Sequence, residues 1–179
     1  MKYYQPAEFD LVDTITLKFK DHFKDLLHCE KNFARAVHFD ELKDLVPELI
    51  KQFEQKQLIY DIGRVFVTVA NTDLPIHLDG NETVQKDLAL NWPVWNTDKG
   101  IMSWYTASDD KQQVGSNPYY SSHIPYYRSE DCELQDSFII NEPTWVKIGV
   151  PHGVKNLSDL NRVIISFRFR PEPYHIWQD

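Results

Sequence analysis

The spacing of apolar residues changes after about residue 57, and that change constrains the fold more than any other feature. Between residues 39 and 57, apolar side chains recur every three or four positions and would share one helix face: Leu42, Leu45, Val46, Leu49, Ile50 and Phe53. From about residue 60 they recur every second position, in short segments that end at turn residues. This order predicts a mainly β, α+β protein, a sandwich or barrel with helices packed outside.

Pro47 interrupts the helical stretch, because proline cannot donate a backbone hydrogen bond inside a helix. The helix therefore either kinks there or ends, and a second helix begins with Pro47 in its first turn. Asp40 is the expected N-cap of the first helix. Upstream, residues 14–20 alternate polar and apolar side chains, which predicts a strand with Ile15, Leu17 and Phe19 on one face.

The strands expected after the helices cover residues 62–70, 88–95, 101–105, 137–140, 144–150 and 162–169. The 88–95 segment is almost continuously apolar, which predicts burial on both faces, and Pro93 suggests a bulge or an edge. No internal repeat divides the chain, so we expect one domain over residues 1–179. In it, residues 1–58 form an extended arm and the helical support, 59–169 the β core, and 170–179 an irregular tail.

Residues 107–131 differ from the strands on either side of them. They are polar and rich in tyrosine, and their apolar residues follow no clear period. A segment of this length without a period is usually either a functional lid or a disordered insert. The four tyrosines between Tyr119 and Tyr127 favour an ordered lid.

Composition and charge exclude several classes of function. The formal net charge is −8 and no Lys/Arg cluster is present, so we expect no nucleic-acid partner. The two cysteines, Cys29 and Cys132, have neither the number nor the spacing of a disulfide framework or a thiolate zinc site, which favours a reducing compartment. There is no signal-peptide core and no apolar run near about 20 residues, so we expect a cytoplasmic protein without membrane contact.

The motif His77-Leu78-Asp79 is the first candidate for chemistry. It follows a run of β-forming residues, and positions i and i+2 of a strand point to the same face. An imidazole and a carboxylate would then project side by side, as two ligands of a 2-His-1-carboxylate iron site do. A pair of this kind also occurs by chance, and Asp79 alone could stabilise the turn before Gly80.

His152 and Arg162 complete a larger pattern. His152 lies between Pro151 and Gly153 at the expected exit of a strand, a position that suits a metal ligand. Arg162 follows ten positions later, after a turn, on what should be a neighbouring strand. A guanidinium is the natural bidentate partner of a carboxylate, so the four residues together indicate a metal site with an anion clamp.

This set of residues resembles the Fe(II)- and 2-oxoglutarate-dependent oxygenases. The segments HLDG, ALNWPVWN, SWYTA and VPHGVKN…RVIISFRF look like small, free-standing members related to the aspartyl/asparaginyl β-hydroxylase-like branch, over roughly residues 60–169. The resemblance implies a double-stranded β-helix, also called a jelly roll or cupin-like fold. It implies Fe(II) bound by His77, Asp79 and His152, with 2-oxoglutarate and O₂ as co-reactants and succinate as a product.

The resemblance also implies the residues that hold 2-oxoglutarate. Arg162 would pair with its far carboxylate, and a hydroxyl from Ser166 or Tyr105 would assist. Asn91 matches a position where such enzymes often place a polar group near the cosubstrate. The substrate would be an amino acid, a peptide side chain or another small molecule. Hydroxylation is the default outcome, although the same site supports desaturation or ring closure, and the oligomeric state is not indicated.

Other interpretations remain open at this stage. Arg168 shares strand parity with Arg162 and competes with it as the anion clamp, and Ser166 could simply be a buried hydroxyl. A non-oxygenase metal-binding cupin, such as an isomerase, would keep both histidines and would need a further ligand, for which Glu82 is the nearby candidate. A catalytically silent binding module is the third possibility. Three tryptophans near the motifs could line the pocket or pack in the core, and for most of them we favour the core: Trp92, Trp95 and Trp104.

Overall fold

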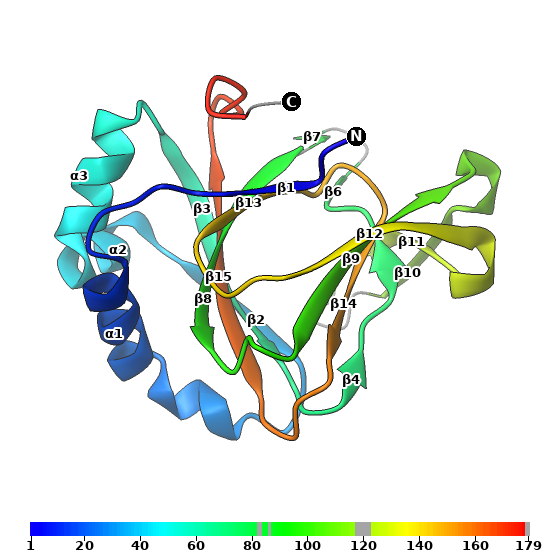
Figure 1. The fold of residues 1–179 in the computed structure, drawn as a ribbon, viewed down its shortest axis with the longest axis horizontal. Helices are drawn as coiled ribbons and strands as arrows, with labels where there is room; N and C mark the ends of the chain where they lie inside the picture. The colour runs from blue at the N-terminus through cyan, green and yellow to red at the C-terminus, as the bar shows by residue number, and fades with distance from the viewer. Residues whose placement is uncertain (82–83, 86, 117–122, 178–179) are drawn as a thin grey trace.

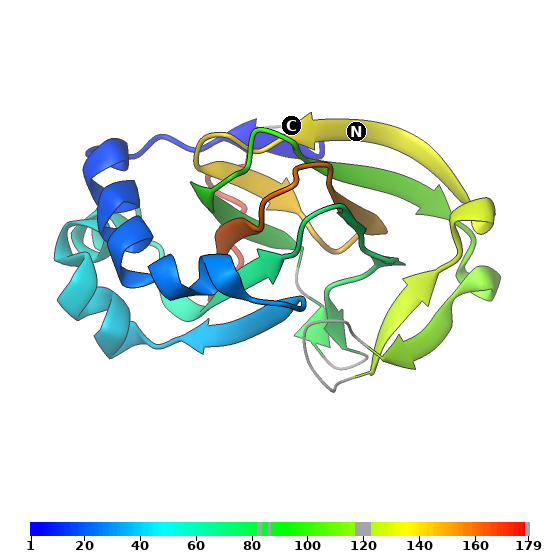
Figure 2. The ribbon, with the colours of Figure 1, turned by 90° about the horizontal axis from the view of Figure 1, so that it is seen from below.

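A computed structural model describes residues 1–81, 84–85, 87–116 and 123–177. Two antiparallel sheets face each other, and helices cover the outer face of one of them (Figures 1 and 2). This arrangement confirms the mainly β fold with helices packed outside that the sequence pattern predicts, and it is the jelly roll that the family resemblance implies. In the part of the chain that the structure describes, no helix is long and apolar enough to cross a membrane.

The first sheet carries the helices. Its described strands run in the order β1 (Tyr4–Pro6), β13 (Thr144–Lys147), β8 (Leu88–Trp95), β15 (Arg162–Phe169), β3 (Tyr60–Thr68) and β2 (Phe33–Val37). The predicted strands 88–95 and 162–169 are confirmed with the same bounds, and β8 is buried almost throughout. Near the N-terminus, β1 pairs with β13 and forms one edge of this sheet.

The second sheet carries the candidate motif. Its described strands run in the order β10 (Gln113–Ser116), β11 (His123–Tyr127), β5 (Ile76–His77), β14 (His152–Asn156), β9 (Gly100–Ala107) and β12 (Cys132–Ile139). The short strand β4 (Thr72–Asp73) also pairs with β14. Strands β6 (Gly80–Asn81) and β7 (Val84–Gln85) pair with each other in a separate two-stranded sheet.

The prediction of a strand at residues 14–20 is wrong, because α1 (Val12–His22) occupies this segment. Ile15 and Phe19 are fully buried, whereas Leu17 is 67% exposed. Ile15 and Phe19 stand four residues apart, and this spacing also puts them on one helix face. Burial of this pair against the first sheet explains why the helix forms despite the alternating pattern.

The second helical region breaks at Pro47 into α2 (Phe39–Leu45) and α3 (Pro47–Gln55). Pro47 stands in the first turn of α3, where its missing N–H costs no hydrogen bond. The helix therefore does not kink at Pro47. It ends before this residue, and a second helix begins there. The expected N-cap is wrong by two positions, since His38 occupies the N-cap position of α2, without a side-chain capping hydrogen bond, and Asp40 lies in the first helical turn.

Successive side chains of the central strand β15 point alternately to the hydrophobic core and to the pocket. On β15, Val163, Ile165, Phe167 and Phe169 pack under the helices in the main hydrophobic cluster. Arg162, Ile164, Ser166 and Arg168 point to the opposite face, toward the second sheet. The space between the sheets therefore receives polar and charged side chains from the centre of the first sheet.

The predicted lid at 107–131 forms regular structure over the part that is described. Strands β10 and β11 pair as a hairpin, and β11 then pairs with β5, so the hairpin extends the second sheet beside His77 (Figure 1). Residues 117–122, which include Tyr119 and Tyr120, lie outside the described residues. The expected tail at 170–179 is mainly turns through residue 177.

An ion-pair cluster ties the helical layer to β2. Glu41, in the first turn of α2, accepts two hydrogen bonds from the Arg35 guanidinium, at 2.7 and 3.0 Å, and contacts the His22 ring at 2.8 Å. The Arg35 hydrogen bonds outweigh the opposing effect of burial and lower the pKa of Glu41 to about 2. The folded protein thus favours the ionised carboxylate.

We expect Glu41→Gln to lower the free energy of unfolding at pH 7 by about 1 kcal/mol, because solvent screens this partly exposed pair. A depressed pKa stabilises the fold above the usual carboxyl pKa near 4.5, and this contribution disappears as the pH falls toward 2. Urea unfolding at pH 7 and pH 3 measures the effect, with the exposed Glu30→Gln as control. An equal deficit at both pH values would contradict the linkage.

Candidate metal and anion site

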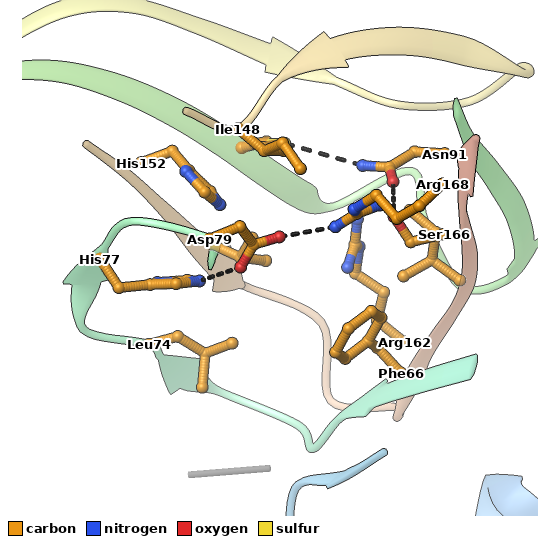
Figure 3. Close-up of a pocket in the computed structure, with 13 residues that line it drawn as sticks. Phe66, Leu74, His77, Asp79, Asn91, Ile148, His152, Arg162, Ser166 and Arg168 are labelled. Atoms are coloured by element: carbon orange, nitrogen blue, oxygen red, sulfur yellow. Dashed lines mark hydrogen bonds and ion pairs between the residues drawn. The ribbon is translucent and has the colours of Figure 1, made fainter. Parts of the chain in front are cut away.

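One pocket lies between the two sheets and collects most of the predicted residues (Figure 3). Its apolar walls include Phe66, Met102, Ile148 and Ile164. Its polar lining consists of His77, Asp79, Asn91, His152, Arg162, Ser166 and Arg168. The sequence motifs from both sheets therefore converge on a single space.

Strand pairing positions the two histidines. His77 ends β5 and His152 opens β14, and the two residues are cross-strand partners with ring centroids 4.5 Å apart. The ring Nδ1 of His77 is 2.9 Å from the Pro75 carbonyl oxygen, and Nδ1 of His152 is 2.9 Å from that of Val150. These contacts fix both rings so that Nε2 remains available to a ligand.

His152 lies at the start of a strand, and not at the end of one as the sequence predicts. It was expected at the exit of a strand over 144–150, but β13 ends at Lys147 and His152 begins the next strand. Asp79 likewise lies just beyond β5 rather than on it, and its N–H donates to the Ile148 carbonyl at 3.2 Å. Its Oδ1 still approaches His77 Nε2 to 3.6 Å.

His77, Asp79 and His152 offer one ligand atom each, and these atoms all lie within 4.8 Å of one another. Metal–ligand bonds of about 2 Å allow one ion to sit among donors at this separation after a small inward movement. Two imidazoles and one carboxylate fit Fe(II), because this facial set leaves coordination positions open. The ligand atoms of these three residues therefore fit the Fe(II) ion that the family resemblance implies. Glu82, the alternative cupin ligand, lies outside the described residues.

The protonation states favour metal binding at two of the three residues. Burial, aided by the charge of His77, lowers the pKa of His152 to about 4, so its ring is neutral near pH 7. Burial alone would raise the pKa of Asp79, but the contacts with His77 and Arg168 hold it well below its usual range. For His77, the Asp79 carboxylate outweighs burial and raises the pKa.

Both candidate anion clamps line the pocket, and they occupy different positions in it. Arg162 opens β15 and is only 2% exposed. Arg168 lies at the other end of the strand, where its Nη2 donates to Asp79 Oδ2 at 2.6 Å. Its Nη1 donates to Ser166 Oγ at 2.5 Å, and the Ser166 hydroxyl donates to Asn91 Oδ1.

Tyr105 is the one predicted cosubstrate residue that does not line the pocket. It stands on β9 three positions after Met102, whose side chain does line it, so alternation turns Tyr105 to the other face. The core role of the tryptophans is supported, because Trp92 and Trp104 are fully buried in the hydrophobic clusters and Trp95 packs against one of them. The sequence did not reveal the contact between Arg168 and Asp79, although strand parity placed Arg168 on the pocket face.

Comparisons with known proteins support the fold. The sequence matches no family model and no curated protein sequence. Among solved structures, it is similar to the non-heme alpha-ketoglutarate-dependent carbocyclase SnoK from nogalamycin biosynthesis, at 12% identity and a TM-score of 0.53, covering 93% of this chain and 79% of that one. Oxalate decarboxylase from Bacillus subtilis matches at 10% identity and a TM-score of 0.37, covering 82% of this chain and 27% of that one. The chain therefore spans about a quarter of the length of the decarboxylase.

Proposed function

We propose that this protein is an Fe(II)- and 2-oxoglutarate-dependent dioxygenase that hydroxylates an amino acid, a peptide side chain or another small molecule. The observation that carries the proposal is the convergence of His77, Asp79 and His152 in a pocket that also contains the buried Arg162. The fold that the chain shares with a 2-oxoglutarate-dependent carbocyclase is consistent with it. We also propose a cytoplasmic location, on the basis of the low cysteine content of the sequence.

The chain's own residues would divide the work. Fe(II), when bound with 2-oxoglutarate, supplies the activation of O₂ and the oxidising power. His77, Asp79 and His152 would hold the metal, and Arg162 would bind the far carboxylate of 2-oxoglutarate through charge-assisted hydrogen bonds. The apolar walls, such as Phe66 and Ile164, would limit water at the reacting centre and strengthen these electrostatic contacts.

The buried Arg162 favours an oxygenase over the two alternatives. Its guanidinium is 2% exposed and lines the same pocket as the three candidate metal ligands, where it can form charge-assisted hydrogen bonds with the far carboxylate of a bound dicarboxylate. A non-oxygenase cupin needs the metal ligands but not a dicarboxylate clamp. A silent binding module needs neither group in this arrangement.

The experiment is an aerobic incubation of the purified protein with Fe(II), 2-oxoglutarate and a panel of free amino acids and short peptides, with succinate quantified. We expect succinate release that requires both Fe(II) and 2-oxoglutarate and that a matching substrate increases. The Asp79→Ala variant should release none above background, because it lacks the carboxylate ligand. Metal binding without any 2-oxoglutarate consumption would contradict the proposal.

Gly100 offers an indirect test of the Arg162 position. A β-carbon at Gly100 would lie 2.4 Å from both Cδ and Nε of Arg162, so any larger residue must displace this buried side chain. We expect Gly100→Ala to raise the 2-oxoglutarate concentration needed for half-maximal succinate release by roughly tenfold, the cost of weakening one charged hydrogen bond. Gly153→Ala, where the nearest atom would be 3.5 Å away, is the matched control. An unchanged requirement in Gly100→Ala would argue against a cosubstrate role for Arg162.

A further inference from the structure

We propose that Arg168 is a positioning residue for the metal ligand Asp79, and that Ser166 and Asn91 serve Arg168 rather than the cosubstrate. The inference rests on the proposed function, since it assigns roles within the same site. It also separates the two arginines that the sequence left as competitors. Arg162 is then the cosubstrate clamp and Arg168 the support of the metal site.

The two oxygens of the Asp79 carboxylate have different partners (Figure 3). Oδ1 faces His77, with Nε2 at 3.6 Å, and Oδ2 accepts a hydrogen bond from Arg168 Nη2 at 2.6 Å. A carboxylate held in this way presents one oxygen to the space shared with the histidines. Asp79 would therefore bind the metal through Oδ1 alone, which leaves a further coordination position open for a co-reactant.

The Arg168 guanidinium is itself held in place. Its Nη1 donates to the Ser166 hydroxyl, which in turn donates to the Asn91 side-chain carbonyl. Ser166 and Asn91 are cross-strand partners on β15 and β8, two adjacent strands in the interior of the first sheet. Each member of the chain Asn91–Ser166–Arg168–Asp79 is buried or half-buried, so the geometry is set before a metal arrives.

This arrangement assigns new roles to two of the predicted cosubstrate residues. The Ser166 hydroxyl already gives its proton to Asn91 and accepts one from Arg168, so its single donor is in use. Contacts of this kind outside the ligand sphere typically change metal affinity by about 10- to 100-fold when they are removed. We therefore expect a defect in metal binding, and not in 2-oxoglutarate binding alone, when the chain is broken.

The test is a titration of the metal-free protein with Co(II), which is a stable substitute for Fe(II). The binding is monitored by visible absorbance, and no 2-oxoglutarate is added. We expect Arg168→Met to weaken Co(II) binding by about 10- to 100-fold and to change the shape of the Co(II) bands, because Asp79 becomes free to bind through both oxygens. Arg168→Lys keeps a charge beside Oδ2 and should restore the wild-type band shape. Arg162→Met, the same substitution on the same face of β15, should leave Co(II) binding unchanged.

Ser166→Ala gives a second approach if Arg168→Met folds poorly. It removes the support of Arg168 but keeps the guanidinium, so we expect a smaller loss of Co(II) affinity in the same direction. Wild-type affinity and band shape in both Arg168→Met and Ser166→Ala would overturn the inference, and so would an equal loss in Arg162→Met. Failure of the wild-type protein to bind Co(II) at all would instead contradict the proposed metal site.

Discussion

A His152→Ala variant is expected to lose Fe(II) affinity by about 100-fold or more and to lose succinate release with it. The loss of a ligand should exceed the roughly 10- to 100-fold effect of removing a contact behind a ligand. His152 contributes a buried, neutral imidazole that lies directly across from His77. The remaining imidazole and carboxylate cannot form the three-ligand face that iron requires.

Equilibrium dialysis with Fe(II) under anaerobic conditions measures this effect, with His28→Ala as the matched control. His28 is exposed at the end of a short 3-10 helix and far in sequence from the pocket residues. Circular dichroism of the metal-free variant would separate loss of the site from loss of the fold. Retained iron-dependent turnover in a folded His152→Ala protein would remove this residue from the metal site.

An Arg162→Met variant is expected to need about 10- to 100-fold more 2-oxoglutarate for half-maximal succinate release, while its metal binding remains intact. The estimate corresponds to a charged hydrogen-bond pair worth about 1.5–3 kcal/mol. Methionine preserves most of the apolar stem and removes only the guanidinium, so packing against the neighbouring strands should survive.

The exposed Arg128→Met is the control for this variant, because it removes an equal charge from a residue outside the pocket lining. The measurement is the dependence of the initial rate on 2-oxoglutarate concentration at saturating Fe(II). An unchanged dependence in Arg162→Met would move the clamp to Arg168, and the division of roles between the two arginines would then be wrong.

The strands that sequence predicts best are those with one consistent physical signal. β8 and β15 lie in the interior of their sheet, so their apolar runs mark both ends correctly. The segment around Ile15 and Phe19 carries two signals at once, because these residues fit both a strand face and a helix face. Only the tertiary burial of Ile15 and Phe19 decides for the helix, and a local pattern does not contain that information.

The candidate site shows the same limit. His77, Asp79, His152 and Arg162 could be selected from spacing, because the residue types needed for iron and for a carboxylate are few. The contact between Arg168 and Asp79 depends on how closely the two sheets approach at that point, which the sequence does not state. Tyr105 does not line the pocket, because alternation along β9 puts Met102 on the pocket face and Tyr105 on the opposite one.

The most direct test of the iron and 2-oxoglutarate site is an anaerobic titration of the wild-type protein with Fe(II) and then with 2-oxoglutarate, followed by visible absorbance. We predict a weak metal-to-ligand charge-transfer band that requires both additions, reaches a maximum at one equivalent of Fe(II), and is absent in Asp79→Ala. Bound metal without the band would contradict the 2-oxoglutarate site and favour a metal-binding cupin. Absence of metal binding would contradict the site as a whole and leave a jelly-roll binding module.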